Sequence, residues 1–306
     1  MVSDAAKLHF LLAGDARVRW GMAAAVGSIL RVLPVERAAQ ITVIDGGLPP
    51  DLMARLTERV EAAGKQISFI PFRWPEGCNA PALEGSRLAY ARLLASEVID
   101  SDYCLYFDTD LVLREDPTPL FEAARRTPFV PLWAVQNYPD HSYEYQLGRQ
   151  TNELLSAATV GAVYFNSGFL LINVKAWRDL DVAKRCFALA EQYQFICHDQ
   201  DALNVLFVRE WRELPERWNF QLYERTTFPL DAAALHYSGR NKPWHFGYPK
   251  AARRSFLEAL AAAGFPRWRP KVNLTEWLRN SRFRPFFSAM LYNLRRAAGK
   301  NGVKKR

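Results

Sequence analysis

Two aspartates that directly follow an apolar run could bind a divalent cation. The segment LYFDTDLVL places Asp108 and Asp110 one residue apart, after the apolar residues 105–107. Two such carboxylates repel each other, and no lysine or arginine lies beside them in the sequence, so a divalent cation would remove the penalty. Oxygen ligands favour Mg²⁺ or Mn²⁺, which also bridge diphosphates. The alternative is a pair of ordinary turn acids after a strand, and the spacing alone does not separate the two.

A second polar segment, HYSGRNKPW, begins at His236. His236 could be a third metal ligand, since imidazole suits Mn²⁺ better than Mg²⁺. Gly239 permits close approach of the backbone to an anion, and Lys242 can place a point charge on a phosphate. The alternative is a surface loop whose histidine is satisfied by its neighbours.

Two further polar segments interrupt apolar elements. Residues 166–168 form an Asn-Ser-Gly corner inside FNSGFLLIN, which either makes a bulge or presents side chains to a ligand. In HDQDALN, Asp199 could simply cap a helix. Gln200 and Asp201 would then lie at the helix entrance and face outward, beside the ligand-binding edge of the sheet.

The elements around these motifs predict an α/β fold. The first half alternates apolar runs with helical patterns, which predicts a mostly parallel central sheet with helices on both faces. Ligands bind at the carboxyl ends of the strands of such a sheet, where Asp108 falls. We expect Asp51 to cap the second helix and residues 137–160 to form a loop over the ligand. The expected strands are residues 7–13, 41–45, 67–70, 103–107, 129–135, 167–174 and 233–237, and the expected helices are 23–33, 51–63, 84–99, 180–194 and 199–207.

Taken together and in this order, FDTD, FNSGFLLIN, DQDALN and HxxGxxKPW resemble the motifs of glycosyltransferase family 8. This family includes bacterial lipopolysaccharide galactosyl- and glucosyltransferases and glycogenin. The resemblance covers about residues 7–246. It implies a GT-A fold, a UDP-sugar donor, a Mn²⁺ cofactor with Mg²⁺ as the alternative, and transfer with retention at the anomeric carbon.

The resemblance also assigns residues. The implied metal ligands are Asp108, Asp110 and His236. Gln200 matches a position around the donor sugar, Asp201 matches an acid near the anomeric carbon, and these two are the implied catalytic residues. In the implied donor site, Ala13 and Asp15 match the uridine pocket, and Gly239 and Lys242 match the diphosphate contacts. The whole donor set is Ala13, Asp15, Arg92, Asp108, Thr109, Asn166, Asp199, Gln200, Gly239 and Lys242.

Two segments depart from the family pattern. Residues 15–18 read Asp-Ala-Arg-Val where the family often has Asp-x-Asn-Tyr, and Gln136 stands where some galactosyltransferases have an aspartate. Neither the uridine contact nor galactose as donor sugar therefore follows from the resemblance. Retention is possible by same-face attack, which we favour, or by two inversions through a covalent intermediate. The second route needs a carboxylate, for which Asp201 is the candidate.

Length, composition and charge limit the class of protein and the kind of partner. The chain has 306 residues, 49% of them hydrophobic, which is enough for a substantial core. Its formal charge is +8, but nine basic residues follow Glu276, and +8 less these nine leaves −1 for residues 1–276. The basic character therefore belongs to a tail, and with no RNP or zinc-finger pattern we expect no nucleic-acid partner.

Four cysteines without a CxxC pair indicate reduced thiols in the cytoplasm. The apolar run 8–13 is too short for a signal peptide, and no window of about 20 apolar residues could span a membrane.

We expect a catalytic domain over residues 1–248 and a basic helical segment over residues 249–306. Six apolar residues of the tail share one helical face, flanked by arginines and lysines: Phe283, Phe286, Phe287, Met290, Leu291 and Leu294. Such a helix is suited to an anionic bilayer surface. It predicts peripheral attachment at the inner face of the cytoplasmic membrane, with a lipid-linked saccharide or another glycan as acceptor. The alternative is a helix packed on the catalytic domain.

Two competing functions use the same residues. A metal-dependent nucleotidyltransferase or phosphohydrolase could use Asp108 and Asp110, although the sequence lacks the further acids of a two-metal site. A non-catalytic nucleotide-sugar-binding protein would bind the donor without turnover. Neither GxGxxG nor GxxxxGK[ST] is present, so a metal or individually placed cations must hold any bound phosphates.

Overall fold

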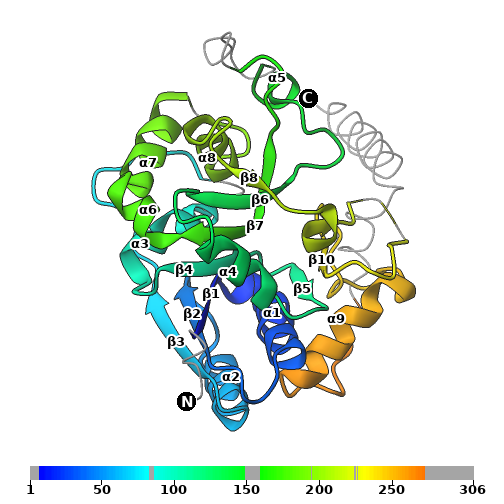
Figure 1. Cartoon of the computed structure of the whole chain (residues 1–306). Coiled ribbons are helices and arrows are strands. Elements are labelled where there is room, and N and C mark those ends of the chain that lie inside the picture. The colour runs from blue at the N-terminus through cyan, green and yellow to red at the C-terminus, as the bar shows by residue number, and fades with distance from the viewer. Residues whose placement is uncertain are drawn as a thin grey trace, which may run out of the picture.

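The computed structural model describes residues 7–82, 86–148, 159–193, 195–223, 225 and 227–272. Within them, the main sheet has the strand order β3-β2-β1-β4-β7-β6-β8 (Figure 1). Strands β3, β2, β1 and β4 are parallel, β7 runs antiparallel to β4 and β6, and β8 pairs parallel with β6. The predicted α/β class is therefore confirmed. The bounds are β1 Leu8–Gly14, β2 Ala39–Asp45, β3 Gln66–Pro71, β4 Tyr103–Phe107, β6 Leu132–Gln136, β7 Phe165–Asn173 and β8 Arg212–Glu213.

Helices cover both faces of this sheet because its strands are apolar on both sides (Figure 1). The side chains of β1 alternate between the two faces. Phe10 and Leu12 join the core under α1, α2, α4 and α9, whereas Leu11 joins the core under η2, α6, α7 and α8. The bounds are η1 Ala16–Val18, α1 Arg19–Val32, α2 Pro50–Ala62, η2 Leu88–Leu94, α3 Ala95–Val98, α4 Thr118–Arg125, α5 Tyr143–Gly148, α6 Val174–Asp179, α7 Val182–Tyr193, α8 Asp199–Leu206, η4 Glu216–Asn219 and α9 Lys250–Ala262.

A smaller sheet joins the two halves of the chain beside the end of β4. Its strands are β5 Leu111–Leu113, β10 Ala234–His236 and β9 Phe220–Gln221, in the order β5-β10-β9. β10 pairs antiparallel with β5, and His236 lies opposite Leu111. This register brings the histidine of the second polar segment beside the two aspartates that precede β5.

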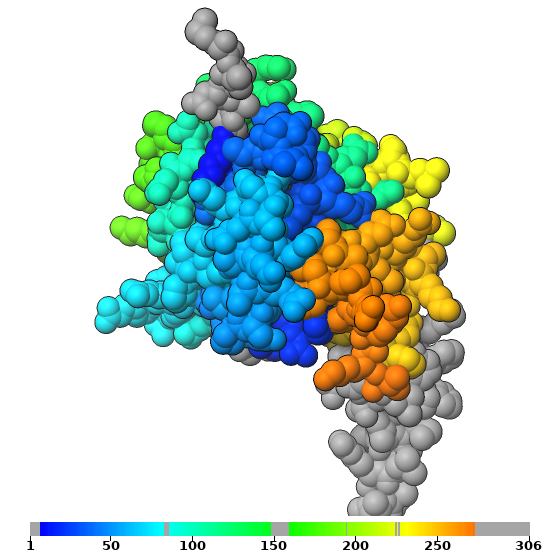
Figure 2. Space-filling view, turned by 90° about the horizontal axis from the view of Figure 1, so that it is seen from below, coloured from blue at the N-terminus to red at the C-terminus, as the bar shows by residue number. Residues whose placement is uncertain are grey.

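α9 follows the predicted boundary at residue 248 and packs on α1. A side chain at Gly27 of α1 would overlap the carbonyl of Ala259, so the two helix backbones lie very close together. Arg59 of α2 donates to the carbonyl of Ala262 at 3.3 Å. Figure 2 shows α9 (orange) against the N-terminal helices (blue). The boundary stays a prediction, and the tail helix over residues 280–306 lies outside the described residues.

Several predicted element bounds were wrong. α1 begins at Arg19 rather than at residue 23, because Trp20 packs on Phe265 and Trp268. Asp51 lies in the first turn of α2 and Pro50 precedes it there, so Asp51 is not the cap. Residues 84 and 85 of the predicted helix 84–99 lie outside the described residues, and the rest of it contains the 3₁₀ helix η2 followed by the short α3.

The second half also differs from its prediction. The expected loop 137–160 contains α5, and residues 149–158 of it lie outside the described residues. α6, which begins immediately after β7, was not predicted. No helix among the described residues is long and apolar enough to cross a membrane.

Candidate active site

The loop between β4 and β5 is held in place by backbone hydrogen bonds from three directions. Asp108 N donates to the carbonyl of Gly168 in β7 at 2.9 Å, and Leu111 N donates back to the carbonyl of Asp108 at 2.9 Å. Tyr237 N donates to the carbonyl of Asp110 at 2.8 Å. The backbone that carries both aspartates is therefore fixed by the two neighbouring sheets.

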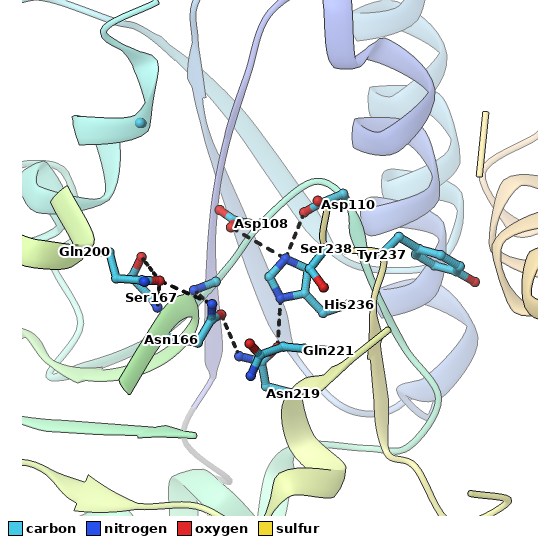
Figure 3. A network of polar contacts seen from close by, with 12 residues as sticks. Asp108, Asp110, Asn166, Ser167, Gln200, Asn219, Gln221, His236, Tyr237 and Ser238 are labelled. Atoms are coloured by element: carbon cyan, nitrogen blue, oxygen red, sulfur yellow. Dashed lines mark hydrogen bonds and ion pairs between the residues drawn. The ribbon is translucent and has the colours of Figure 1, made fainter. Parts of the chain in front are cut away.

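Asp108, Asp110 and His236 converge at this loop, as predicted from the family motifs. One ligand atom from each lies within 4.8 Å of the other two. His236 Nε2 is 3.3 Å from Asp110 Oδ1 and 3.9 Å from Asp108 Oδ2 (Figure 3). Two carboxylates and one imidazole nitrogen are ligands that suit Mn²⁺. The residues present fit a divalent cation in both type and convergence.

A glycine permits this convergence. A side chain at Gly168 would overlap the His236 ring and lie 2.9 Å from both Asn166 Oδ1 and Asp108 Oδ2. Real Cβ atoms do not approach other atoms that closely, so the hydrogen atom of Gly168 is what lets β7 pass against the three ligands. The polar corner of FNSG thus forms part of the site and is not simply a bulge.

Two cations screen the aspartates, contrary to our expectation of unscreened carboxylates. The Arg92 guanidinium lies 2.9 Å from Asp108 Oδ1 and 2.9 Å from Asp199 Oδ2, and Lys242 Nζ contacts Asp110 Oδ2. The prediction considered only neighbours in the sequence. Arg92 comes from η2 and Lys242 from the loop after β10, both outside the local neighbourhood of Asp108 in the chain.

These contacts shift the pKa values of the charged groups. Burial alone would lower the pKa of Arg92, but the carboxylates of Asp108 and Asp199 hold it above its usual range. Burial alone would raise the pKa of Asp110, but Lys242 and His236 hold it well below its usual range. Burial raises the pKa of Asp199 to about 6, against the lowering influence of Arg92. Asp199 therefore holds a proton more readily than an ordinary aspartate does.

A pocket of about 730 Å³ opens beside Asp108 at the carboxyl ends of β1 and β4. It is lined by seven of the predicted donor residues: Ala13, Asp15, Arg92, Asp108, Thr109, Gly239 and Lys242. The other ten lining residues were not predicted, and four of them are polar or aromatic side chains from the loops after β1 and β10: Arg17, Arg240, Trp244 and His245. Arg240 and Trp244 stand inside the segment HYSGRNKPW, so the signal that singled out Lys242 could also have found them.

The start of the pocket, after β1, has its own ion pair. Asp15 accepts a hydrogen bond from Arg17 N at 2.9 Å and pairs with the Arg17 guanidinium at 2.8 Å. The Asp15 carboxylate thereby caps η1. Arg17, which pairs with it, stands where the family motif often has Asn, and Val18 stands where the motif often has Tyr.

The remaining predicted residues form a hydrogen-bonded network beside the pocket (Figure 3). Asn166 Nδ2 donates to Gln200 Oε1 at 3.2 Å, and Asn166 Oδ1 accepts from Asn219 Nδ2 at 2.9 Å. Asp199 is not the cap of α8 but its first residue, and its carboxylate contacts Arg92 and Ser167. Asn219 was not predicted, and no motif in its neighbourhood marks it.

Asp201 does not face outward as predicted. Its side chain is fully buried, and it accepts hydrogen bonds from the hydroxyl of Tyr164 at 2.5 Å and from Cys197 N at 2.7 Å. Because α8 begins at Asp199, position 201 falls on the face that packs on the core. Gln200 is only partly buried, and its amide oxygen accepts from Ser167 N at 2.9 Å.

Comparisons with known proteins match this architecture. The family described as Glycosyl transferase family 8 matches residues 20–247. General stress protein A of Bacillus subtilis is 27% identical over 243 residues, which cover 71% of this chain and 80% of that protein. The lipopolysaccharide 1,3-galactosyltransferase of Salmonella typhimurium is 26% identical over 278 residues, covering 84% and 79%. A crystal structure of the galactosyltransferase LgtC with donor and acceptor sugar analogs matches with a TM-score of 0.67 and 27% identity, covering 90% of this chain and 100% of that one.

Proposed function

Because the chain belongs to glycosyl transferase family 8 and is a hexosyltransferase, we propose that it moves a hexose from a UDP-sugar to a glycan acceptor with retention at the anomeric carbon. Its α/β architecture is the GT-A fold. The observation that carries the proposal is the convergence of Asp108, Asp110 and His236 at the mouth of a pocket lined by Lys242 and Gly239. A cation site beside a cationic pocket suits the diphosphate of a nucleotide-sugar.

In the proposed donor complex, the residues of the chain hold the diphosphate and the sugar. Lys242 offers a point charge to a phosphate oxygen, and Gly239, with φ +92, allows the backbone to approach it closely. Asp108, Asp110 and His236 would hold Mn²⁺, which supplies a Lewis acid against the charge that develops on the leaving UDP. Asn166, Asp199 and Gln200 flank this position and offer polar groups to the sugar.

The burial of Asp201 supports attack on the face from which UDP leaves. A covalent intermediate needs a carboxylate below the anomeric carbon, and Asp201 is bound to Tyr164 and to a backbone N–H instead. On the same-face route, the acceptor oxygen bonds to the anomeric carbon while the bond from that carbon to the β-phosphate oxygen breaks. The proton of the acceptor hydroxyl passes to the leaving phosphate. Gln200 positions the sugar, and we expect Gln200→Ala to lower kcat more than it raises KM.

Product analysis after mixing with Mn²⁺ and a UDP-sugar tests the proposal. We would screen UDP-glucose, UDP-galactose, UDP-GlcNAc and UDP-galacturonate and measure UDP. Slow release of UDP from at least one hexose donor, abolished by EDTA and by Asp110→Ala, is the expected result. UMP with sugar 1-phosphate would instead indicate a phosphohydrolase or nucleotidyltransferase, and donor binding without any product would indicate a non-catalytic binder.

For the acceptor, we propose a lipid-linked saccharide at the cytoplasmic face of the membrane. The support comes from the lipopolysaccharide transferase among the relatives and from the basic, amphipathic sequence of residues 280–306. Deleting residues 280–306 should leave UDP release intact and abolish sedimentation with anionic liposomes. Loss of UDP release in the truncated protein would show that these residues belong to the catalytic fold and would refute the membrane role.

A further inference from the structure

Two backbone N–H groups of β7 set the orientation of the amide side chains beside the site. Ser167 N donates to Gln200 Oε1 at 2.9 Å, and Gly168 N donates to Asn166 Oδ1 at 3.0 Å. A backbone N–H can only donate, so each of these two partners must present its carbonyl oxygen there. The amide nitrogen of Asn166 agrees with this orientation, because Nδ2 donates to Gln200 Oε1 at 3.2 Å.

The orientation of the Asn166 amide determines that of the Asn219 amide, which in turn determines which nitrogen of His236 carries a proton. Asn166 Oδ1 can only accept, so Asn219 must present its Nδ2, which lies 2.9 Å away. The carbonyl oxygen of Asn219 then faces the imidazole ring, 2.9 Å from His236 Nδ1. Because that oxygen also can only accept, Nδ1 must carry the proton.

We propose that Asn219 is a positioning residue that keeps a proton on Nδ1 of His236, so that Nε2, the ring nitrogen that faces Asp108 and Asp110, is the one that can give its lone pair to a cation. The inference rests on the proposed metal-dependent function, since a bare Nε2 is the form that binds a cation. Figure 3 shows the ring between Asn219 on one side and the two aspartates on the other. If Nδ1 carried no proton, the neutral ring would carry its proton on Nε2, would point an N–H at the cation, and the site would lose one of its three ligands.

Burial makes this arrangement rigid. Asn219 is fully buried and His236 is 5% exposed, so water has little access to replace the amide as the partner of Nδ1. Asn219 ends η4 and directly precedes β9, whose Gln221 pairs with His236 in the small sheet. The amide thus lies directly before β9 and the ring lies at the end of the neighbouring strand β10, so the pairing of the two strands holds them side by side.

The first test reads the tautomer in metal-free, full-length protein. Two-bond ¹H–¹⁵N correlation spectra distinguish the two ring nitrogens, and the signals that vanish in His236→Asn identify this ring among the five histidines. We expect Nδ1 of wild-type His236 to carry a proton, and Asn219→Leu to remove that proton from part or all of the molecules. A wild-type ring with no proton on Nδ1 would overturn the inference, even if Asn219→Leu failed to fold.

The second test measures the Mn²⁺ dissociation constant in the presence of UDP, by calorimetry or by the EPR signal of free Mn²⁺. Asn219→Leu should raise it by about 10- to 100-fold, the usual range when a partner of a metal-bound histidine is removed. The matched control is Asn173→Leu, which removes a buried amide that bonds Pro128 O and Ala176 N, at the other end of β7. The control should lower the melting temperature and leave Mn²⁺ binding unchanged.

Equal Mn²⁺ affinity in Asn219→Leu and wild type would reduce Asn219 to a structural residue and refute its positioning role. The tautomer is read without donor or metal, so its outcome is separate from that of the proposed function. A Nδ1-protonated His236 with Asn219-dependent Mn²⁺ binding would stand even if the protein released no UDP from any donor. In that case the proposed transfer reaction alone would fail.

Discussion

Gly168 lies directly against His236, so a side chain at this position would overlap the imidazole ring. Gly168→Ala should therefore push apart the three residues that we assign to the metal, while its backbone conformation does not itself require glycine. We expect the Mn²⁺ dissociation constant to rise at least about tenfold, since loss of geometry at a metal site costs affinity on this scale. Calorimetric titration with Mn²⁺ and UDP measures the change.

Gly47→Ala is the control for that variant. Gly47 has φ +107 and open space around it, so the alanine strains the backbone without touching the site. It should lower the melting temperature slightly and leave Mn²⁺ affinity unchanged. If Gly168→Ala binds Mn²⁺ as tightly as Gly47→Ala does, the close approach of β7 is not needed for the site.

Arg92 forms ion pairs with the carboxylates of Asp108 and Asp199. Its removal should make the free energy of unfolding depend more strongly on pH. Arg92→Met leaves Asp199 buried without its cation, so its pKa, already raised to about 6, should rise further. In the pH range between the unfolded and the folded pKa, the folded protein then binds more protons than the unfolded chain. Its free energy of unfolding therefore falls as the pH rises through this range.

We expect Arg92→Met to cost about 3–5 kcal/mol at pH 8, the usual range for breaking a buried ion pair, and less at pH 5.5. Urea denaturation at the two pH values measures this. Asp199→Asn in the same chain removes the titrating group, so the double variant should lose the extra pH dependence relative to wild type. A loss of stability that is independent of pH in Arg92→Met would assign the effect to packing alone.

Strands β1, β2 and β4 were predictable from sequence because their residues are apolar over continuous runs, whereas the two- and three-residue strands β5, β8 and β9 were not predicted. β1, β2 and β4 each fell within two residues of their predicted bounds at either end. The helix starts were less accurate, because they depend on distant partners. Trp20 extends α1 to Arg19 by packing on Phe265 and Trp268, and nothing near Trp20 in the sequence indicates those partners.

In the site, too, the features that depend on local sequence were predicted and those that depend on distant partners were not. Asp108 and Asp110 were found from local spacing, and His236 from the order of the motifs. Their convergence depends on the pairing of β5 with β10, a register that the sequence alone does not specify. Asn219 acts only through another side chain, so no spacing rule could find it. The outward position expected for Asp201 was wrong because the sequence does not show which face of α8 packs on the core.

Arg240 should contribute to donor binding through its charge. It is exposed, lines the pocket, and follows Gly239 in the loop proposed to hold the diphosphate. Arg240→Gln should raise KM for the UDP-sugar about threefold to tenfold with little change in kcat, because an exposed charge contributes on the order of 1 kcal/mol to binding. The salt dependence of KM should weaken as well. Arg267→Gln, at an exposed arginine after α9, is the control and should change neither quantity.

Gly27 tests whether the close approach of α1 and α9 contributes to the stability of the fold. An alanine there would overlap the carbonyl of Ala259 and approach Ala263 N to 2.9 Å, so the two helices must move apart. Overpacking of this kind typically costs about 1–3 kcal/mol, and we expect Gly27→Ala to lower the free energy of unfolding by that amount. Gly64→Ala, at a helix end with φ +69 and open space, is the comparison. Because α1 also passes close to Thr109 through Gly21, separation of α1 from α9 should weaken donor binding too. If Gly27→Ala is as stable as wild type, the close approach of α1 and α9 does not contribute to the stability of the fold.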